Sequence, residues 1–179
     1  KNKMSKIKWN LDPSHSEVTF KVKHMMITNV SGSFNEFSVE ADTEGEDFSK
    51  AAISFTAKAA SVNTNSEQRD GHLRSPEFFD TEKFPEITFK GTKYEKVDGE
   101  NYTLKGDLTI KDVTKNIGLQ VEYGGIQKDP WGNMKAGFTI TGKINRKDFG
   151  LNWNAALEAG GVMVSEEVRI YCEIQLVKA

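Results

Sequence analysis

The sequence predicts an all-β protein, an antiparallel barrel or sandwich of about eight strands. Apolar residues recur at every second position through most of the chain, as in strands that have one buried and one wet face. Clusters of Gly, Asp, Asn and Pro separate these runs at short and fairly regular intervals. One segment, near residues 65–75, departs from this period and carries the signal of a short helix.

The strands follow from the alternation, taken in chain order. In the first run, residues 18–22, every second residue is apolar. Phe37 and Val39 belong to the second run, and a bulge is expected just before it, near Asn35. Six later runs repeat the period, with the alternate members Ile53-Phe55-Ala57-Ala59, Ile87-Phe89, Tyr102-Leu104-Gly106-Leu108-Ile110, Ile117-Leu119-Val121-Tyr123, Ala136-Phe138-Ile140-Gly142-Ile144 and Val168-Ile170-Cys172-Ile174-Leu176.

Turn residues connect the later strands. Asp98-Gly99 predicts a tight hairpin between the runs on either side of it. Residues 112–115 and 129–133 are rich in turn formers and join the next two pairs of strands. Because no linker, repeat or low-complexity tract interrupts the runs, residues 1–179 are expected to form a single domain.

The helix signal lies between the third and fourth runs. Thr64 and Glu67 have the spacing of a capping box, with Thr64 as the cap, which predicts a short helix over 68–74. A helix this short and this polar is unstable in water, so it must dock on the rest of the protein and is expected to cover one end of the barrel. The docking residues that we expect are Leu73, Phe78 and Phe79.

The composition narrows the function classes. With 24 Lys and Arg against 26 Asp and Glu, the chain has no electrostatic footprint for nucleic acid or for an anionic membrane surface. No apolar run reaches the length of a transmembrane helix, so no membrane insertion is expected. The single cysteine, Cys172, excludes an internal disulfide and fits a reducing compartment. Because the polar, basic start also lacks a signal-peptide pattern, a cytoplasmic location is expected.

The inward faces of the predicted strands mix large and small residues. An eight-stranded barrel is just wide enough either to be filled by its own side chains or to hold one slender ligand. Small inward residues leave room for a ligand, but they equally mark bends where strands coil, so a packed core and a ligand cavity both stay open. The small residues in question are Ala57, Ala59, Gly106, Ala136 and Gly142.

Motifs spread over nearly the whole chain carry a family resemblance. In order along the chain they are Trp9-Asn10-Leu11-Asp12-Pro13-Ser14-His15-Ser16, Val30-Ser31-Gly32-Ser33-Phe34, Arg69-Asp70-x-His72-Leu73-Arg74-Ser75, Phe84-Pro85-x-Ile87-x-Phe89, Gly106-Asp107-Leu108-Thr109-Ile110-Lys111 and Asn145-Arg146-Lys147-Asp148-Phe149-Gly150-Leu151-x-Trp153. With these motifs the sequence resembles the YceI-like, polyisoprenoid-binding family.

The resemblance implies an extended lipocalin-like antiparallel barrel with a central tunnel for a long isoprenoid or acyl chain. It implies non-catalytic binding, storage or transport of such a lipid, for example a polyprenyl quinone precursor, in a role linked to the envelope or to stress. No cofactor is expected other than the bound lipid. Members of the family are often periplasmic, in contrast to the location expected from this chain.

Candidate tunnel residues follow from the implied architecture together with the alternation. The lining that we expect is Phe20, Val22, Phe55, Phe89, Leu108, Ile110, Phe138, Ile140 and Ile170. Each of these residues singly is as well explained by an ordinary barrel core. The expected head-group or gate residues are Arg69, His72 and Arg74, because Arg and His donate to phosphate, carbonyl and phenol oxygens. The favoured interpretation of this cluster is structural, with Asp70 and Asp80 pairing the arginines to pin the helix to the barrel.

The histidines and the cysteine predict neither a metal site nor a nucleophile. His15 and His24 are an odd number of residues apart, and His72 lies on another element, so no ligand pattern results. His15 is expected to tie down the turn that follows Asp12. Cys172 is in phase with the inward residues and should be buried and inert.

Two other functions stay as alternatives to a lipid carrier. One is a structural or interaction protein whose barrel is filled. The other is an enzyme acting on a lipid held in the tunnel, with His72 or Arg69 at the mouth, although no catalytic motif supports it and no enzyme is predicted. An apolar tunnel mouth favours covering by a second copy, so a homodimer is an open expectation.

Overall fold

The computed structural model describes residues 6–154 and 163–179. The strands of this part of the chain are β1 (Lys6–Leu11), β2 (Glu17–His24), β3 (Thr28–Phe34), β4 (Phe37–Glu44), β5 (Asp47–Lys58), β6 (Val62–Asn63), β7 (Glu86–Asp98), β8 (Asn101–Ile110), β9 (Val113–Lys128), β10 (Met134–Asn145) and β11 (Glu167–Lys178). The helical elements are the 3-10 turns η1 (Pro13–His15), η2 (Ala59–Ser61) and η3 (Arg146–Phe149) and the α-helix α1 (Glu67–Arg74).

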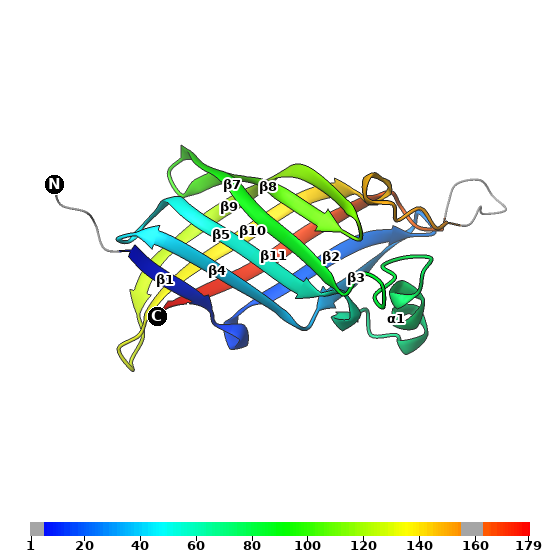
Figure 1. The fold of residues 1–179 in the computed structure, drawn as a ribbon, viewed down its shortest axis with the longest axis horizontal. Coiled ribbons are helices and arrows are strands. Elements are labelled where there is room, and N and C mark those ends of the chain that lie inside the picture. The colour runs from blue at the N-terminus through cyan, green and yellow to red at the C-terminus, as the bar shows by residue number, and fades with distance from the viewer. Residues whose placement is uncertain (1–5, 155–162) are drawn as a thin grey trace.

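The strands form a closed antiparallel barrel (Figure 1). Their hydrogen-bonded order is β1-β4-β5-β7-β8-β9-β10-β11-β2-β3-β6, and a further pairing of β1 with β11 closes the ring. Three successive pairs, β1 with β2, β3 with β4 and β5 with β6, each act as one bent strand, because β4 pairs with β1 and β5 whereas β3 pairs with β2 and β6. Each bent pair, and each of the single strands β7 to β11, counts as one strand of the barrel wall, here called a stave. The barrel therefore has eight staves that are neighbours in chain order, which confirms the predicted eight-stranded barrel.

The bends in the first two staves have local causes. Between β3 and β4 the chain breaks at Asn35, where the sequence predicts a bulge, and the Asn35 N–H donates to the Ser61 carbonyl at 3.1 Å. Between β1 and β2 lies the turn η1, with Pro13 at its start. Proline fits this position because it has no N–H to leave unpaired and its φ is already fixed.

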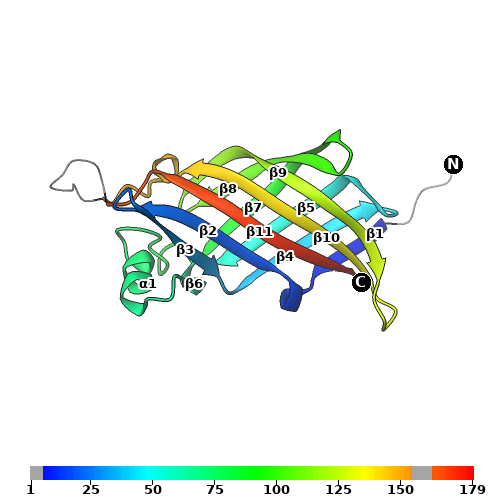
Figure 2. The same cartoon turned by 180° about the vertical axis from the view of Figure 1, so that it is seen from behind.

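The η1 turn forms a seam at which β11 changes partners from β1 to β2, the face seen in Figure 2. At the change the Asp12 N–H donates to the Gln175 carbonyl at 2.8 Å. The buried Asp12 carboxylate accepts from the Lys135 ammonium and from the Ser14 hydroxyl, and His15 Nδ1 lies 2.9 Å from it. The expectation that His15 ties down this turn is confirmed. The Lys135 hydrogen bond holds the pKa of Asp12 well below its ordinary value of 3.8.

The hairpins include two predicted turns, one that lies earlier than predicted and two that sequence reasoning missed. Asp98 and Asn101 pair across the β7–β8 turn, and β9 joins β10 through 129–133, as expected. The turn expected at 112–115 lies at 111–112, because the residues from 113 on already belong to β9.

One missed hairpin joins β4 to β5 at residues 45–46. The other joins β2 to β3, where Met25 and Met26 have φ values of 51° and 62° and expose their side chains. Two successive positive φ values define the tight turn that suits the twist of paired strands, usually built from Asn and Gly.

The helix α1 lies at one end of the barrel (Figure 1), as predicted. Its cap differs from the prediction: Ser66, not Thr64, accepts from the Arg69 N–H, at 3.3 Å. The predicted docking by Leu73, Phe78 and Phe79 agrees with the structure, which places all three on the wall of the interior cavity.

Candidate functional site

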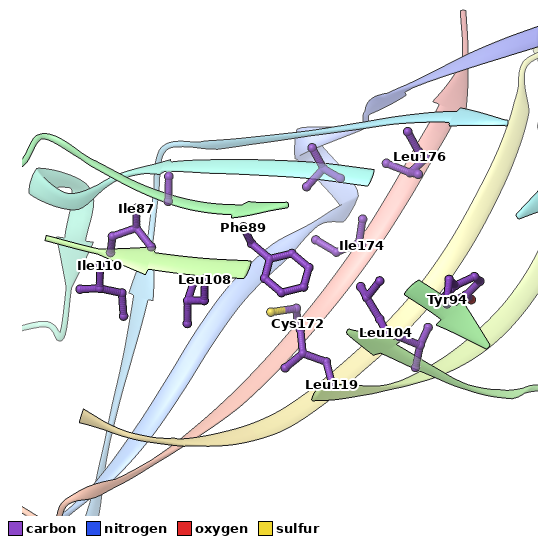
Figure 3. Close-up of a cluster of buried hydrophobic side chains, with 14 of the residues drawn as sticks. Ile87, Phe89, Tyr94, Leu104, Leu108, Ile110, Leu119, Cys172, Ile174 and Leu176 are labelled. Carbon is purple, nitrogen blue, oxygen red and sulfur yellow. The ribbon is translucent and has the colours of Figure 1, made fainter. Parts of the chain in front are cut away.

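The candidate site is a cavity inside the barrel. Its volume is about 270 Å³, and side chains from β2 to β5, from β7 to β11 and from the α1 region line it. The polar members of its wall are Thr19, Thr64, Arg69, Tyr94 and Arg146; the rest are apolar side chains and Cys172. Figure 3 shows part of this wall, with side chains from β7, β8, β9 and β11 gathered in the interior.

All nine residues expected to line a tunnel lie on the wall of this cavity. They are Phe20, Val22, Phe55, Phe89, Leu108, Ile110, Phe138, Ile140 and Ile170. Six of them, including Ile140 and Ile170, are only partly buried although they point into the barrel. The interior is therefore not filled by side chains at these positions, in contrast to the packed-core alternative. Contact of these residues with a ligand stays a prediction.

Two of the small inward residues, Gly106 and Gly142, do not supply the space that the ligand interpretation expected. A Cβ placed on Gly106 would lie 2.4 Å from a ring carbon of Phe89, and one on Gly142 would lie 2.4 Å from a methyl carbon of Leu119. These glycines are covered by large side chains of neighbouring strands. The empty volume therefore lies further in, between the large residues, and enlarging Gly106 would disturb packing before it reached the cavity.

Aromatic side chains pack around the end of the cavity away from α1. The Phe48 ring contacts those of Trp9, Tyr123 and Phe138, with centroids 5.0, 5.8 and 5.1 Å apart. The Trp9 indole is fully buried and donates to the Thr43 hydroxyl at 2.9 Å. Apart from Tyr94, the described residues that line the cavity at this end are apolar, and none of them is charged.

Tyr94 is the polar exception on the aromatic side of the wall. Its ring stacks on that of Tyr102 at 4.7 Å, and its buried hydroxyl has no hydrogen-bond partner among the described residues. Burial raises the pKa of Tyr94 far above its ordinary value, so this group is a neutral donor and not a base.

The other end of the cavity is covered by α1 and the residues that follow it. The Phe79 ring meets Phe34 of β3 edge to face at 5.8 Å. Asp70 is buried and its Oδ1 accepts from both the Thr64 N–H and hydroxyl, at 2.8 and 2.6 Å. Arg69 donates to the same hydroxyl from Nε, at 2.7 Å, and from Nη2 to the Thr64 carbonyl at 2.8 Å.

The structure places only one of the three predicted head-group residues at the cavity. Arg69 lies on the cavity wall, whereas His72 and Arg74 do not. His72 Nε2 lies 3.0 Å from Glu77, and its ring contacts Trp153 at 4.8 Å. The structural interpretation of the cluster is supported, but its details were wrong.

The error concerns the partners of the arginines. Among the described residues no ion pair joins Asp70 or Asp80 to an arginine, and Asp70 instead fixes Thr64. Thr64, expected to cap the helix, is the bridge between the two charged groups: its hydroxyl donates to Asp70 and accepts from Arg69. A hydroxyl can do both at once because it carries one donor and two lone pairs.

Sequence reasoning assigned no role to Arg146, the other cation on the wall. Arg146 begins η3 at the end of β10 and is only 3% exposed. It donates from Nε to the Ser165 carbonyl at 2.8 Å, from Nη1 to Leu151 at 2.6 Å and from Nη2 to Val164 at 3.2 Å. Burial lowers the pKa of its guanidinium. The available signal was a basic residue two positions after Ile144, the last inward residue of a long strand, and therefore in phase with the inward face.

The remaining titratable residues on the wall offer no base for catalysis. Cys172 points inward, as predicted, and burial raises the pKa of its thiol to about 12. Within residues 6–154 and 163–179, no group of three or more His, Cys, Asp or Glu side chains is arranged to hold a metal ion. In the same ranges no helix is both long and apolar enough to cross a bilayer.

A larger hollow of about 590 Å³ lies outside the cavity, along the bends of the first staves. Its wall mixes polar and apolar side chains, including Glu17, Asn35 and Lys58. Exposed charged groups of this kind suit water better than an apolar chain, so we place the candidate site in the interior.

Comparison with known proteins agrees with this geometry. The family model of the YceI-like domain matches residues 9–176. A UPF0312 protein of Staphylococcus aureus is 41% identical over 162 residues, which cover 90% of this chain and 92% of that protein. The crystal structure of the Campylobacter jejuni YCEI protein is 36% identical, with a TM-score of 0.72 and coverage of 94% and 96%.

A more distant structure shares the fold. It is a polyisoprenoid binding domain from Saccharophagus degradans implicated in plant cell wall breakdown, 16% identical, with a TM-score of 0.68 and coverage of 96% of this chain and 98% of that one. The family match spans the barrel from its first strand, β1, to its last strand, β11. This chain belongs to the YceI-like family.

Proposed function

We propose that this protein binds the long apolar chain of an isoprenoid or acyl lipid inside its barrel, and stores or carries that lipid without altering it. The observation that carries the proposal is the apolar interior cavity, whose wall side chains face unfilled space. Transfer of apolar surface out of water is favourable by about 25 cal/mol per Å², so such a cavity holds a lipid tail without specific chemistry.

The comparisons support the ligand class. The Saccharophagus degradans domain, which shares this fold, is described as binding polyisoprenoids. The slender shape of an eight-stranded barrel also suits an extended chain better than a bulky ring system. Isoprenoid and acyl chains both satisfy this shape, and quinone precursors are one isoprenoid class that would fit.

The chemistry of the wall supports a carrier over an enzyme. A general base must hold a free lone pair near neutral pH. Tyr94 and Cys172 both have raised pKa values and stay protonated at that pH, and the described part of the wall has no histidine or carboxylate. The groups that face a bound chain are therefore suited to holding it and not to proton transfer.

Native mass spectrometry of freshly purified protein, followed by organic extraction, tests the proposal. A stoichiometric lipid with a long isoprenoid or acyl chain is the expected result. An apo mass that stays unchanged after incubation with polyprenyl quinones and with fatty acids would sink the carrier function.

A pair of substitutions on β10 locates the bound lipid. Ile140→Trp places a larger side chain in the cavity, whereas Thr141→Trp, one residue along the strand, places it on the outer face. Lipid occupancy should fall at least about tenfold in the Ile140 variant and stay unchanged in the Thr141 variant. Equal occupancy in two folded variants would place the lipid outside the barrel.

A further inference from the structure

The charges on the cavity wall have one sign. Within residues 6–154 and 163–179, the wall contains two arginines, Arg69 and Arg146, and neither aspartate nor glutamate. Arg69 is linked through the Thr64 hydroxyl to the Asp70 carboxylate, so a negative charge lies one hydroxyl away from it. Its side chain is also exposed to water, which screens the charge.

Arg146 differs from Arg69 in both respects. It is almost fully buried, and its three hydrogen bonds all end on neutral backbone carbonyls. The carboxylate that most affects it, Glu166, is exposed and instead forms an ion pair with Lys147 at 2.8 Å. Among the residues that the structure describes, no carboxylate contacts this guanidinium, which is a buried positive charge bonded to neutral groups.

The guanidinium also keeps donors to spare. Of its five N–H groups, three point to carbonyls, which leaves one hydrogen on each Nη nitrogen for a further acceptor. Two N–H groups, one on each Nη nitrogen, can serve the two oxygens of a carboxylate or a phosphate. Because the guanidinium is already removed from water in the folded protein, water screens its charge less than the charge of a surface arginine.

The cavity is asymmetric along its length. β10 ends at the same end of the barrel as α1 (Figure 1), and Arg146 follows its last residue. Trp153, a few residues further on, contacts His72 of that helix. The opposite end consists of the ring cluster around Phe48, where Tyr94 offers only a neutral hydroxyl. An amphiphile with an anionic head is best placed with the head at Arg146 and the tail against the rings.

We infer that the ligand is an amphiphile with an anionic oxygen head, a carboxylate or a phosphate ester, and that Arg146 is the residue that selects it. This inference rests on the proposed function, because it names the head of the lipid whose chain the barrel holds. It assigns the head-group role to Arg146 in place of the predicted set on α1.

The first test uses the unaltered protein and ligands that share one chain. Dissociation constants are measured at pH 8 for oleic acid, oleyl phosphate, oleyl alcohol and oleylamine by displacement of a fluorescent fatty acid. The better of the two anions should bind at least about tenfold more tightly than the alcohol, and the amine should bind most weakly. The stronger anion identifies carboxylate or phosphate as the preferred head.

The outcomes separate this inference from the proposed function. Equal affinity for the anions, the alcohol and the amine would overturn the head-group inference and leave the carrier intact. The same holds if the amine binds most tightly. If none of the four ligands binds, binding of an acyl chain is excluded and the head-group inference falls with it, whereas the isoprenoid carrier is decided by the extraction experiment.

A second test assigns the preference to one arginine. The ratio of the alcohol and acid dissociation constants is compared in Arg146→Gln, Arg69→Gln and Arg169→Gln, the last a surface arginine on β11 that contacts Glu167. The ratio should fall about tenfold only in the Arg146 variant. A purely structural loss would weaken both ligands and leave the ratio unchanged, which would overturn the assignment. A ratio that falls only in Arg69→Gln would return the role to α1.

Discussion

Asp12 holds the seam of the barrel, and removing its carboxylate should cost about 3 kcal/mol of stability. Its side chain is 10% exposed and accepts from the Lys135 ammonium, from Ser14 at 2.8 Å and from the Gln175 amide at 3.3 Å. A hydrogen bond to a charged group contributes about 1.5–3 kcal/mol, and all three bonds end on the charged carboxylate. Water reaches the exposed Ser14 in Asp12→Ala and recovers part of that sum, so about 3 kcal/mol remains.

The same contact predicts the acid limit of stability. Because the pKa of Asp12 is lowered in the folded state, its contribution is fully present above the unfolded value of about 3.8. It is lost progressively as the pH falls from about 4 towards the lower folded pKa. Asp12→Asn, which cannot ionise, should lack this part of the acid dependence.

Urea unfolding followed by tryptophan fluorescence measures both effects. The free energy of unfolding is compared at pH 7 and at intervals down to pH 2 for the unaltered protein, Asp12→Ala, Asp12→Asn and Lys135→Met. The double-mutant cycle between positions 12 and 135 should give a coupling of about 1–3 kcal/mol at pH 7. A loss below about 0.5 kcal/mol in Asp12→Ala, or parallel pH curves for the unaltered protein and Asp12→Asn, would refute the reasoning.

Three further predictions concern a turn, a covered glycine and the thiol. Replacing Met25-Met26 by Asn-Gly should raise the free energy of unfolding by about 1–2 kcal/mol, because both positions have positive φ; a lower urea midpoint would contradict this. Gly106→Ala should cost about 1–3 kcal/mol, since its Cβ would lie 2.4 Å from a ring carbon and 2.6 Å from a carbonyl oxygen. Gly118→Ala, whose Cβ meets open space, is the matched control in the same urea titration, and equal losses would contradict the packing argument. Cys172, with its pKa raised to about 12, should resist iodoacetamide at pH 8 until urea unfolds the protein; rapid alkylation of the folded protein would show that the thiol is accessible.

The alternation of apolar residues determined which side of each long strand faces the interior. Side chains alternate strictly along a strand, so an inward Phe138 makes Ile140 inward whatever the rest of the fold does. For the same reason all nine expected lining residues reached the cavity wall without knowledge of the strand order. The hairpin at Asp98-Gly99 could be predicted for a similarly local reason, because these two adjacent residues by themselves favour a tight turn.

Strands with a weaker or shorter signal escaped prediction. In β3 the inward positions are Val30, Gly32 and Phe34, and a glycine at the centre interrupts the apolar pattern. In β1 the alternation of Ile7, Trp9 and Leu11 is present but short, and it ends at the turn before Pro13. β1 and β2 act as one bent stave because both pair with strands far along the chain. No local sequence pattern encodes such pairing.

What the sequence by itself determined is therefore the family, the barrel and the inward faces, because each follows from local periodicity or from motifs. Tertiary structure decided where the empty space lies and which charge borders it. Gly106 is covered because Phe89 of the neighbouring strand lies over it. Arg146 stands in the charged run 145–148, which locally resembles a solvated turn; it is buried where the carbonyls of Leu151, Val164 and Ser165 accept from its guanidinium. Contacts between residues distant in the chain set both features, so only the folded protein reveals them.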